Sequence, residues 1–136
     1  MAELNNENTI QWSDEEMKQH KWLQECLLEQ TATTEEFQPA WQAYKYLVGG
    51  KMYAYIGNDD RVSRHIITLK LEPAFSEALR DKYEDIVPGY YMNKTHWSSV
   101  YLDGNVPIDA LKDIVRASHE WVCKALSKKV REQLGM

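Results

Sequence analysis

The fold is decided by residues 41–56, which read WQAYKYLVGGKMYAYI. Aromatic and β-branched residues favour strands on both sides of Gly49-Gly50, over residues 41–48 and 51–56. Glycine accepts the positive φ angles that a two-residue hairpin turn requires. The segment therefore predicts two antiparallel strands joined by a tight turn.

Tyrosines occupy alternate positions in both predicted strands. Because successive strand residues point to opposite faces, Tyr44 and Tyr46 share one face of their strand, and Tyr53 and Tyr55 share one face of theirs. If these faces coincide and stay open, they form a stacking or peptide-docking surface. The alternative is packing in the core or at an edge, which the high strand propensity of aromatic residues favours.

Three more strands are predicted after this hairpin. A polar loop over residues 57–61 precedes one of them, and the other two follow the turn at residues 88–89. The three predicted strands are His65–Leu71, Tyr90–Asn93 and His96–Leu102.

Three helices complete the predicted elements. Residues 13–16 read SDEE, a capping box that starts a helix to about Gln30. Pro73 suits the first turn of a short second helix. Pro107 opens the last helix, whose inward positions follow a helical period: Leu111, Ile114, Val115, Ser118, Val122, Ala125 and Leu126.

The predicted element order is α-β-β-β-α-β-β-α, with five antiparallel strands. Consecutive antiparallel strands with helices collected on one face make a two-layer α+β sandwich. Residues 1–12 are polar and without period, so they are predicted to be a flexible acidic lead-in. Residues 13–136 are predicted to form a single domain, since this length is enough for one core.

The composition is 43% hydrophobic and 27% charged, as in ordinary globular proteins. No run approaches the roughly 18 apolar residues of a membrane span, and the N-terminus lacks the pattern of a signal peptide. We therefore expect a cytoplasmic monomer without a membrane role. In that compartment Cys26 and Cys123 should stay reduced and serve as packing residues.

Charge is unevenly distributed along the chain. The formal net charge is -5, but residues 1–36 hold nine carboxylates and only two lysines. The later part of the chain is therefore slightly positive. Because the local potential steers a charged partner, a basic face on this part remains compatible with nucleic-acid binding.

Residues 90–104 read YYMNKTHWSSVYLDG, and this block resembles the MmcQ/YjbR family. The resemblance extends from Trp41 to the end of the chain, and shorter matches support it: GGKMY at 49–53, Leu69-Lys70 before Pro73, and Ser118 followed by a basic tail. It implies a two-layer fold similar to secretion chaperones or CyaY. The family is commonly labelled DNA-binding by analogy with winged folds, so the resemblance also implies a DNA partner.

Asn93, Lys94 and His96 form the most suggestive polar cluster of the sequence. An imidazole, an ammonium and an amide at a strand entrance suit anion binding or proton transfer. The alternative is a structural role, because turn side chains commonly bond the backbone. In that interpretation the turn buries Trp97 and orients the following strand.

A second candidate is a basic stripe on the last helix, although Glu120 interrupts it. The stripe could face phosphates, or it could be the solvated side of the helix with its cations near the negative end of the dipole. Together the two candidates give a predicted nucleic-acid-binding set of Lys94, His96, Arg116, Lys124, Lys128, Lys129 and Arg131.

Catalytic and metal sites are not predicted. His20, His65, His96 and His119 are scattered, and neither cysteine has a ligand at the short spacing of a zinc site. No serine lies in the glycine-flanked elbow of a hydrolase. We therefore expect no cofactor, no metal and no enzyme activity.

The sequence thus favours weak, non-specific DNA binding, with a protein or peptide interaction module of chaperone-like shape as the alternative. A small-molecule binder is the third class. A continuous basic face would support DNA, an open aromatic face with a groove would support a protein partner, and a deep pocket at Lys94 and His96 would support a ligand.

Overall fold

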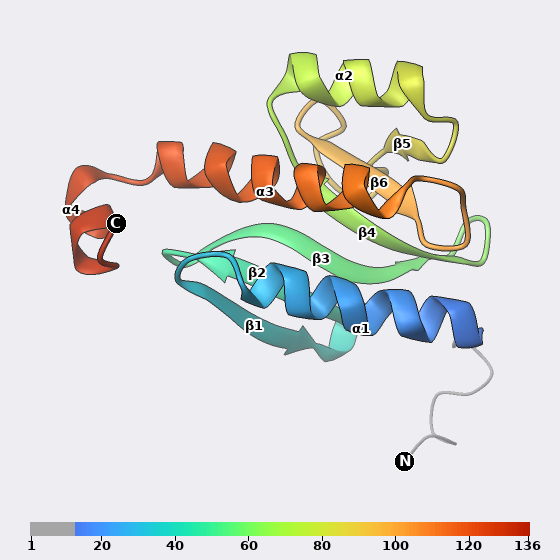
Figure 1. Cartoon of the computed structure of the whole chain (residues 1–136), viewed down its shortest axis with the longest axis horizontal. Coiled ribbons are helices and arrows are strands. Elements are labelled where there is room, and N and C mark those ends of the chain that lie inside the picture. Colours follow the sequence, from blue (N-terminus) through green and yellow to red (C-terminus); the bar gives the residue numbers. More distant parts are fainter. Residues whose placement is uncertain (1–12) are drawn as a thin grey trace.

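The computed structural model describes residues 13–136, so the predicted lead-in over residues 1–12 lies outside the described part. It is an α+β sandwich in which helices cover one face of a six-stranded antiparallel sheet (Figure 1). This confirms the predicted fold class. The strands lie in the order β1-β2-β3-β4-β6-β5. The elements are α1 (Asp14–Leu28), β1 (Thr33–Gln38), η2 (Pro39–Trp41), β2 (Ala43–Val48), β3 (Lys51–Asp59), β4 (Arg64–Lys70), α2 (Pro73–Lys82), β5 (Ile86–Pro88), β6 (Trp97–Tyr101), α3 (Ile108–Ala125) and α4 (Lys128–Gln133).

The capping box of α1 is present as predicted. The Glu16 N–H donates to Ser13 Oγ at 3.1 Å, and the Ser13 N–H donates to Glu16 Oε1 at 3.0 Å. These bonds satisfy two of the backbone donors that a helix start leaves free. The helix then buries Leu23 and Leu27 against the sheet.

The β2–β3 hairpin also forms as predicted, with φ angles of 59° at Gly49 and 80° at Gly50. Its register shifts by one residue between Tyr46 and Leu47, which leaves Tyr53 as an extra residue in β3. Because of this bulge, Tyr53 lies in the helix-side core and Tyr55 in the cluster on the opposite face. The prediction that both tyrosines share a face is therefore wrong.

Strand β1 was not predicted. Its sequence, TTEEFQ, is mostly polar because it is an edge strand that pairs only with β2 and keeps most of its side chains exposed or half-buried. Period-two apolar alternation, the signal used for strands, is absent from such a segment. The sheet accordingly has six strands where the sequence predicted five.

The predicted strand over Tyr90–Asn93 is also wrong, because these residues form a turn in which the Met92 N–H donates to the Gly89 carbonyl at 3.0 Å. The short strand is β5, which ends at Pro88. Pro88-Gly89 closes this strand, and the Gly89 N–H donates to the Trp97 carbonyl at 2.8 Å.

The last predicted helix is divided in two. Helix α3 stops at Ala125, Leu126 is extended with ψ of 147°, and Ser127 caps α4 by accepting from the Val130 N–H at 3.1 Å. The basic residues expected on one helix therefore lie on two helices with different directions (Figure 1).

Two apolar clusters lie on the two faces of the sheet. The larger one holds the inner sides of α1, α2 and α3, and the smaller one comprises Ala43, Tyr55, Ile66 and Tyr101. We call the side of the smaller cluster the helix-free face. None of the helices in the described part of the chain is long and apolar enough to cross a membrane.

Candidate functional site

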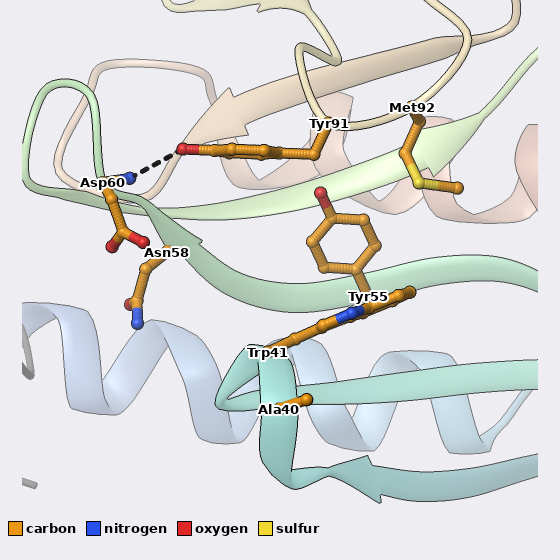
Figure 2. Close-up of a pocket in the computed structure, with 7 residues that line it drawn as sticks. All are labelled: Ala40, Trp41, Tyr55, Asn58, Asp60, Tyr91 and Met92. Carbon is orange, nitrogen blue, oxygen red and sulfur yellow. Dashed lines mark hydrogen bonds between the residues drawn. The ribbon is translucent and has the colours of Figure 1, made fainter.

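A hollow of about 380 Å³ opens on the helix-free face (Figure 2). We call it the aromatic pocket. Three segments that are distant in the sequence build it: the η2 turn, the end of β3 and the loop between β5 and β6. It is lined by Ala40, Trp41, Tyr55, Asn58, Asp60, Tyr91 and Met92.

Trp41 forms one wall of the aromatic pocket. It ends the η2 turn, and Gln42 follows with a φ of 51°, so the chain turns sharply before β2 begins. The ring is 46% exposed and its centroid lies 5.7 Å from that of Tyr55, which is buried. Lys45 Nζ lies 5.8 Å from the Trp41 ring and is ion-paired with Glu36 at 3.2 Å.

Tyr91 forms the opposite wall and is fixed through its hydroxyl. The hydroxyl accepts from the Asp60 N–H at 3.1 Å and donates to Asp59 Oδ1 at 3.4 Å. The ring is 51% exposed. In Figure 2 the Tyr91 ring lies on one side of the Tyr55 side chain and the Trp41 ring on the other, with Asp60 and Asn58 toward one end.

Asp59 organises the polar end of this face. It is 2% exposed, and its carboxylate accepts from the Arg61 backbone N–H at 3.1 Å and from the Arg61 guanidinium at 2.7 Å. The Tyr101 hydroxyl approaches it at 3.5 Å. Burial, followed by the Asp59 charge, raises the pKa of Tyr101, and burial likewise raises the pKa of Tyr55. Both phenols are therefore neutral at physiological pH.

Cations already lie on the aromatic rings beside the pocket. The Arg61 guanidinium lies 3.4 Å from the centre of the Tyr90 ring, and Lys94 Nζ lies 4.5 Å from it. Arg64 lies 3.7 Å from the Tyr101 ring and is ion-paired with Asp103 and Asp85. Lys94, one of the predicted site residues, thus belongs to this face.

His96 supports the turn before β6. Its N–H donates to the Asn93 carbonyl at 3.2 Å, and its carbonyl accepts from the Leu71 N–H at 2.7 Å. The side chain is half-buried, and its Nδ1 is buried with no hydrogen-bond partner among the described residues. Trp97, which follows, is 7% exposed, so the turn buries this residue as predicted.

The other predicted site residues lie on α3 and α4, and Figure 1 shows α4 at the end of the molecule away from β5 and β6. Arg116 is ion-paired with Asp113 at 2.8 Å. Lys124, Lys128, Lys129 and Arg131 are exposed and form no ion pair with the described residues. Lys124 and Arg131 line a second hollow of about 460 Å³. The structure thus divides the predicted set between two surfaces.

Cys123 and His119 also line the second hollow. The Cys123 sulfur lies 3.6 Å from His119 Nε2 and 3.8 Å from Nδ1, and Nε2 bonds the Thr31 carbonyl at 2.8 Å. Burial raises the pKa of the Cys123 thiol, which disfavours the thiolate that a nucleophile needs. The pair was missed in the sequence, although its spacing of four residues on a helix places both side chains on one face.

Metal ligands are not assembled in the described part of the chain, where no group of three or more His, Cys, Asp or Glu side chains is placed to hold an ion. The aromatic pocket was also missed as a site. Its walls come from strand, turn and loop, and only Tyr55 had been considered as part of an aromatic face.

Comparison with known proteins shows which family this sequence represents. The family whose profile matches residues 28–121 is YjbR. The uncharacterized protein YjbR of Escherichia coli (strain K12) is 32% identical over 94 residues, which are 69% of this chain and 78% of that protein. YyaQ of Bacillus subtilis (strain 168) is 35% identical over 63 residues, which are 46% of this chain and 52% of that protein.

Solved structures agree with this assignment. The crystal structure of Deinococcus radiodurans protein DR2400, described as a DUF419 domain, has a TM-score of 0.75 and 32% identity, and the match covers 86% of this chain and 88% of that chain. A crystal structure from Pseudomonas syringae shares the fold, with a TM-score of 0.61 at 23% identity over 74% of this chain and 96% of that one. The resemblance to the MmcQ/YjbR family is therefore confirmed, although the matched span is 28–121 rather than 41–136, and the chain belongs to the YjbR family.

Proposed function

We propose that this protein is a non-catalytic interaction module that binds a peptide segment of a partner protein in the aromatic pocket. The observation that carries the proposal is the pair of half-exposed rings, Trp41 and Tyr91, on either side of Tyr55 in a hollow of about 380 Å³. A hollow of this volume accepts a side chain or a short segment. Trp and Tyr are the residues that most often anchor protein partners.

The rigidity of the pocket supports the same proposal. Tyr91 is fixed by two hydrogen bonds to residues 59–60, and Tyr55 is fixed by burial in β3. Walls that are ordered before binding lose little conformational entropy when a partner arrives. A peptide would therefore gain affinity without reorganising the sheet.

The chemistry of the described side chains supports a non-enzymatic role. The thiol closest to an imidazole belongs to Cys123, and burial holds its pKa above the ordinary value. Thr68 and Ser99 on the helix-free face bond each other through their hydroxyls at 2.7 Å, and neither hydroxyl has an adjacent base in the described structure. Activated nucleophiles need such a base or a lowered pKa.

A library of random peptides displayed on phage tests the proposed function. The parent protein should enrich a shared sequence pattern, and Trp41→Ala should lose that pattern because it removes one wall. Phe37→Ala is the matched control, since Phe37 is a similarly exposed aromatic residue, 48% exposed, that packs against Tyr44 rather than in the pocket. If Trp41→Ala enriches the same peptides as the parent, the pocket is not the binding site.

We propose weak DNA binding as a second candidate, because four exposed cations lie together on α3 and α4. Lys124, Lys128, Lys129 and Arg131 have no carboxylate partner among the described residues, so their charge is free to attract phosphate. The net charge of -5 opposes strong binding. A titration with mixed-sequence duplex DNA at two salt concentrations tests this candidate.

A further inference from the structure

We propose that the aromatic pocket takes an arginine side chain of the partner peptide. This inference rests on the proposed function and names the residue that the pocket recognises. It depends on two features of the pocket: aromatic rings that line a hollow of about 380 Å³, and a carboxylate without an ion pair among the described residues at one end.

The walls suit a flat, polarisable group. Figure 2 shows the rings of Tyr91 and Trp41 on opposite sides of the Tyr55 side chain. The Tyr91 ring is held by its hydroxyl, and the Trp41 ring packs against Tyr55 at a centroid distance of 5.7 Å. A planar guanidinium stacks on such rings, whereas a compact ammonium group has no plane to stack.

The charge around the pocket favours a cation. Asp59 is neutralised by Arg61 at 2.7 Å, and Lys45 is neutralised by Glu36 at 3.2 Å. Asp60 is exposed and forms no ion pair with the described residues. Asp60 is therefore the one charged side chain among the described residues that line the pocket itself, whereas Lys94, which has no ion pair with the described residues either, lies over the Tyr90 ring beside it.

Neighbouring rings show that this face already uses the same chemistry within the chain. Arg61 stacks on Tyr90 at 3.4 Å and Arg64 stacks on Tyr101 at 3.7 Å. No cation of residues 13–136 forms such a contact with Tyr55 or Tyr91. An arginine from a partner would repeat the arrangement there, and its N–H donors would reach oxygens that Asp60 and Asn58 supply.

The test compares three synthetic peptides, acetylated and amidated, that differ at one central residue in a glycine context. The residue is arginine, citrulline or lysine. Citrulline keeps the shape of arginine but lacks its charge, so it isolates the charge contribution. Binding is followed by the shift of the Trp41 indole N–H signal in a proton–nitrogen correlation spectrum, which Trp41→Phe identifies among the five tryptophans.

The arginine peptide should bind about tenfold more tightly than the citrulline peptide, as a charge-assisted hydrogen bond together with a cation–π contact predicts. Lysine should be weaker than arginine. Asp60→Asn should reduce the preference for arginine over citrulline to about two- to fivefold, because the charge-assisted hydrogen bond is lost while the cation–π contact remains. Asp81→Asn is the matched control, since Asp81 is an exposed aspartate on α2, and it should change nothing.

Equal affinity for arginine and citrulline, or for arginine and lysine, would overturn the inference and leave the proposed peptide-binding function standing. Tight binding of arginine that Asp60→Asn does not alter would also overturn it. The phage experiment gives a separate result, because its random peptides do not presuppose an arginine. If the parent protein enriches no shared sequence pattern, the proposed peptide-binding function itself is wrong.

Discussion

At the scale of single residues, Ser118 explains how the bulge in β3 is tolerated. It is fully buried on the apolar side of α3, and its hydroxyl donates to the Tyr53 carbonyl at 2.9 Å. Tyr53 is the extra residue of the bulge, so the sheet leaves its backbone groups unpaired. The Tyr53 hydroxyl in turn bonds Thr33 at 2.8 Å and the Leu27 carbonyl at 3.2 Å. Ser118 thereby connects α3 to the β3 bulge, and this bulge directs the Tyr55 side chain to the pocket.

Ser118→Ala is therefore expected to destabilise the protein by about 1–3 kcal/mol, the cost of leaving a buried carbonyl without a partner. Urea unfolding followed by circular dichroism measures the loss. Ser127→Ala is the control, because Ser127 is exposed and caps only the short helix α4, so its effect should be smaller. Equal stability of Ser118→Ala and the parent would show that the Tyr53 carbonyl does not depend on this hydroxyl.

At the scale of elements, patterns in the sequence predicted the parts that bury apolar residues. The hairpin, α1 and the start of α3 were found because their signals are local: a glycine pair, a capping box and a helical period. Strand β1 was missed because an exposed edge carries no apolar alternation. The break at Leu126 was missed because Leu126 itself continues the apolar period into the core while its backbone is extended.

Helix α1 is also joined to the sheet by a buried polar contact, between Glu16 Oε2 and His65 Nδ1 at 3.0 Å. Burial opposes the charge of Glu16, but hydrogen bonds from the Ser13 N–H and from His65 outweigh it, so the pKa of Glu16 lies below its ordinary value of 4.5. A carboxylate whose pKa is lowered by folding stabilises the folded state above the unfolded pKa. This contribution is lost as the pH falls from 4.5 through the folded pKa.

Glu16→Gln should lower the free energy of unfolding by about 1 kcal/mol at neutral pH, since a hydrogen bond to a charged group is replaced by one to a neutral amide. Glutamine still serves in a capping box, so the helix start is preserved. As the pH falls from 4.5 through the lowered pKa of folded Glu16, the difference from the parent should shrink, because the stabilisation by the ionised carboxylate is lost over this range. Urea midpoints at several pH values measure this, with the exposed Glu15→Gln as control. A difference that stays constant with pH would exclude the ionised Glu16 as its source.

At the scale of the whole molecule, the fold could be predicted and the pocket could not. Strand and helix signals, together with the family block at residues 90–104, were sufficient for a two-layer α+β sandwich. The pocket joins residues 40–41, 55–60 and 91–92, and their proximity depends on the bulge and on a turn that had been predicted as a strand. The basic set was also divided, because Lys94 lies in the loop between β5 and β6, whereas α4 lies at the end of the molecule away from these strands (Figure 1).

The two proposed binding surfaces lie at opposite ends of the β2–β3 hairpin. A side chain at Gly49 would meet Leu126 and Val130, so α4 lies at the turn of the hairpin, whereas Trp41 precedes the other end of β2. Six strand residues span about 20 Å, which exceeds the Debye length of about 8 Å at physiological salt. Charges on one surface should therefore barely affect binding at the other.

Replacing Lys124, Lys128, Lys129 and Arg131 by Gln together should abolish DNA binding and leave peptide binding unchanged, and Trp41→Ala should do the reverse. In the parent, the logarithm of the DNA affinity should fall with the logarithm of the salt concentration by about 0.9 per phosphate contact, so a few contacts give a shallow slope. The four-Gln variant should unfold at nearly the same urea concentration, because exposed charges contribute little to stability. Fluorescence anisotropy with labelled duplex and with a phage-selected peptide measures both activities on the same preparations.

If the four-Gln variant binds DNA like the parent, or the parent fails to bind even at low salt, the cations of α3 and α4 do not form a DNA surface. If Trp41→Ala weakens both activities equally, one shared surface replaces the two proposed here.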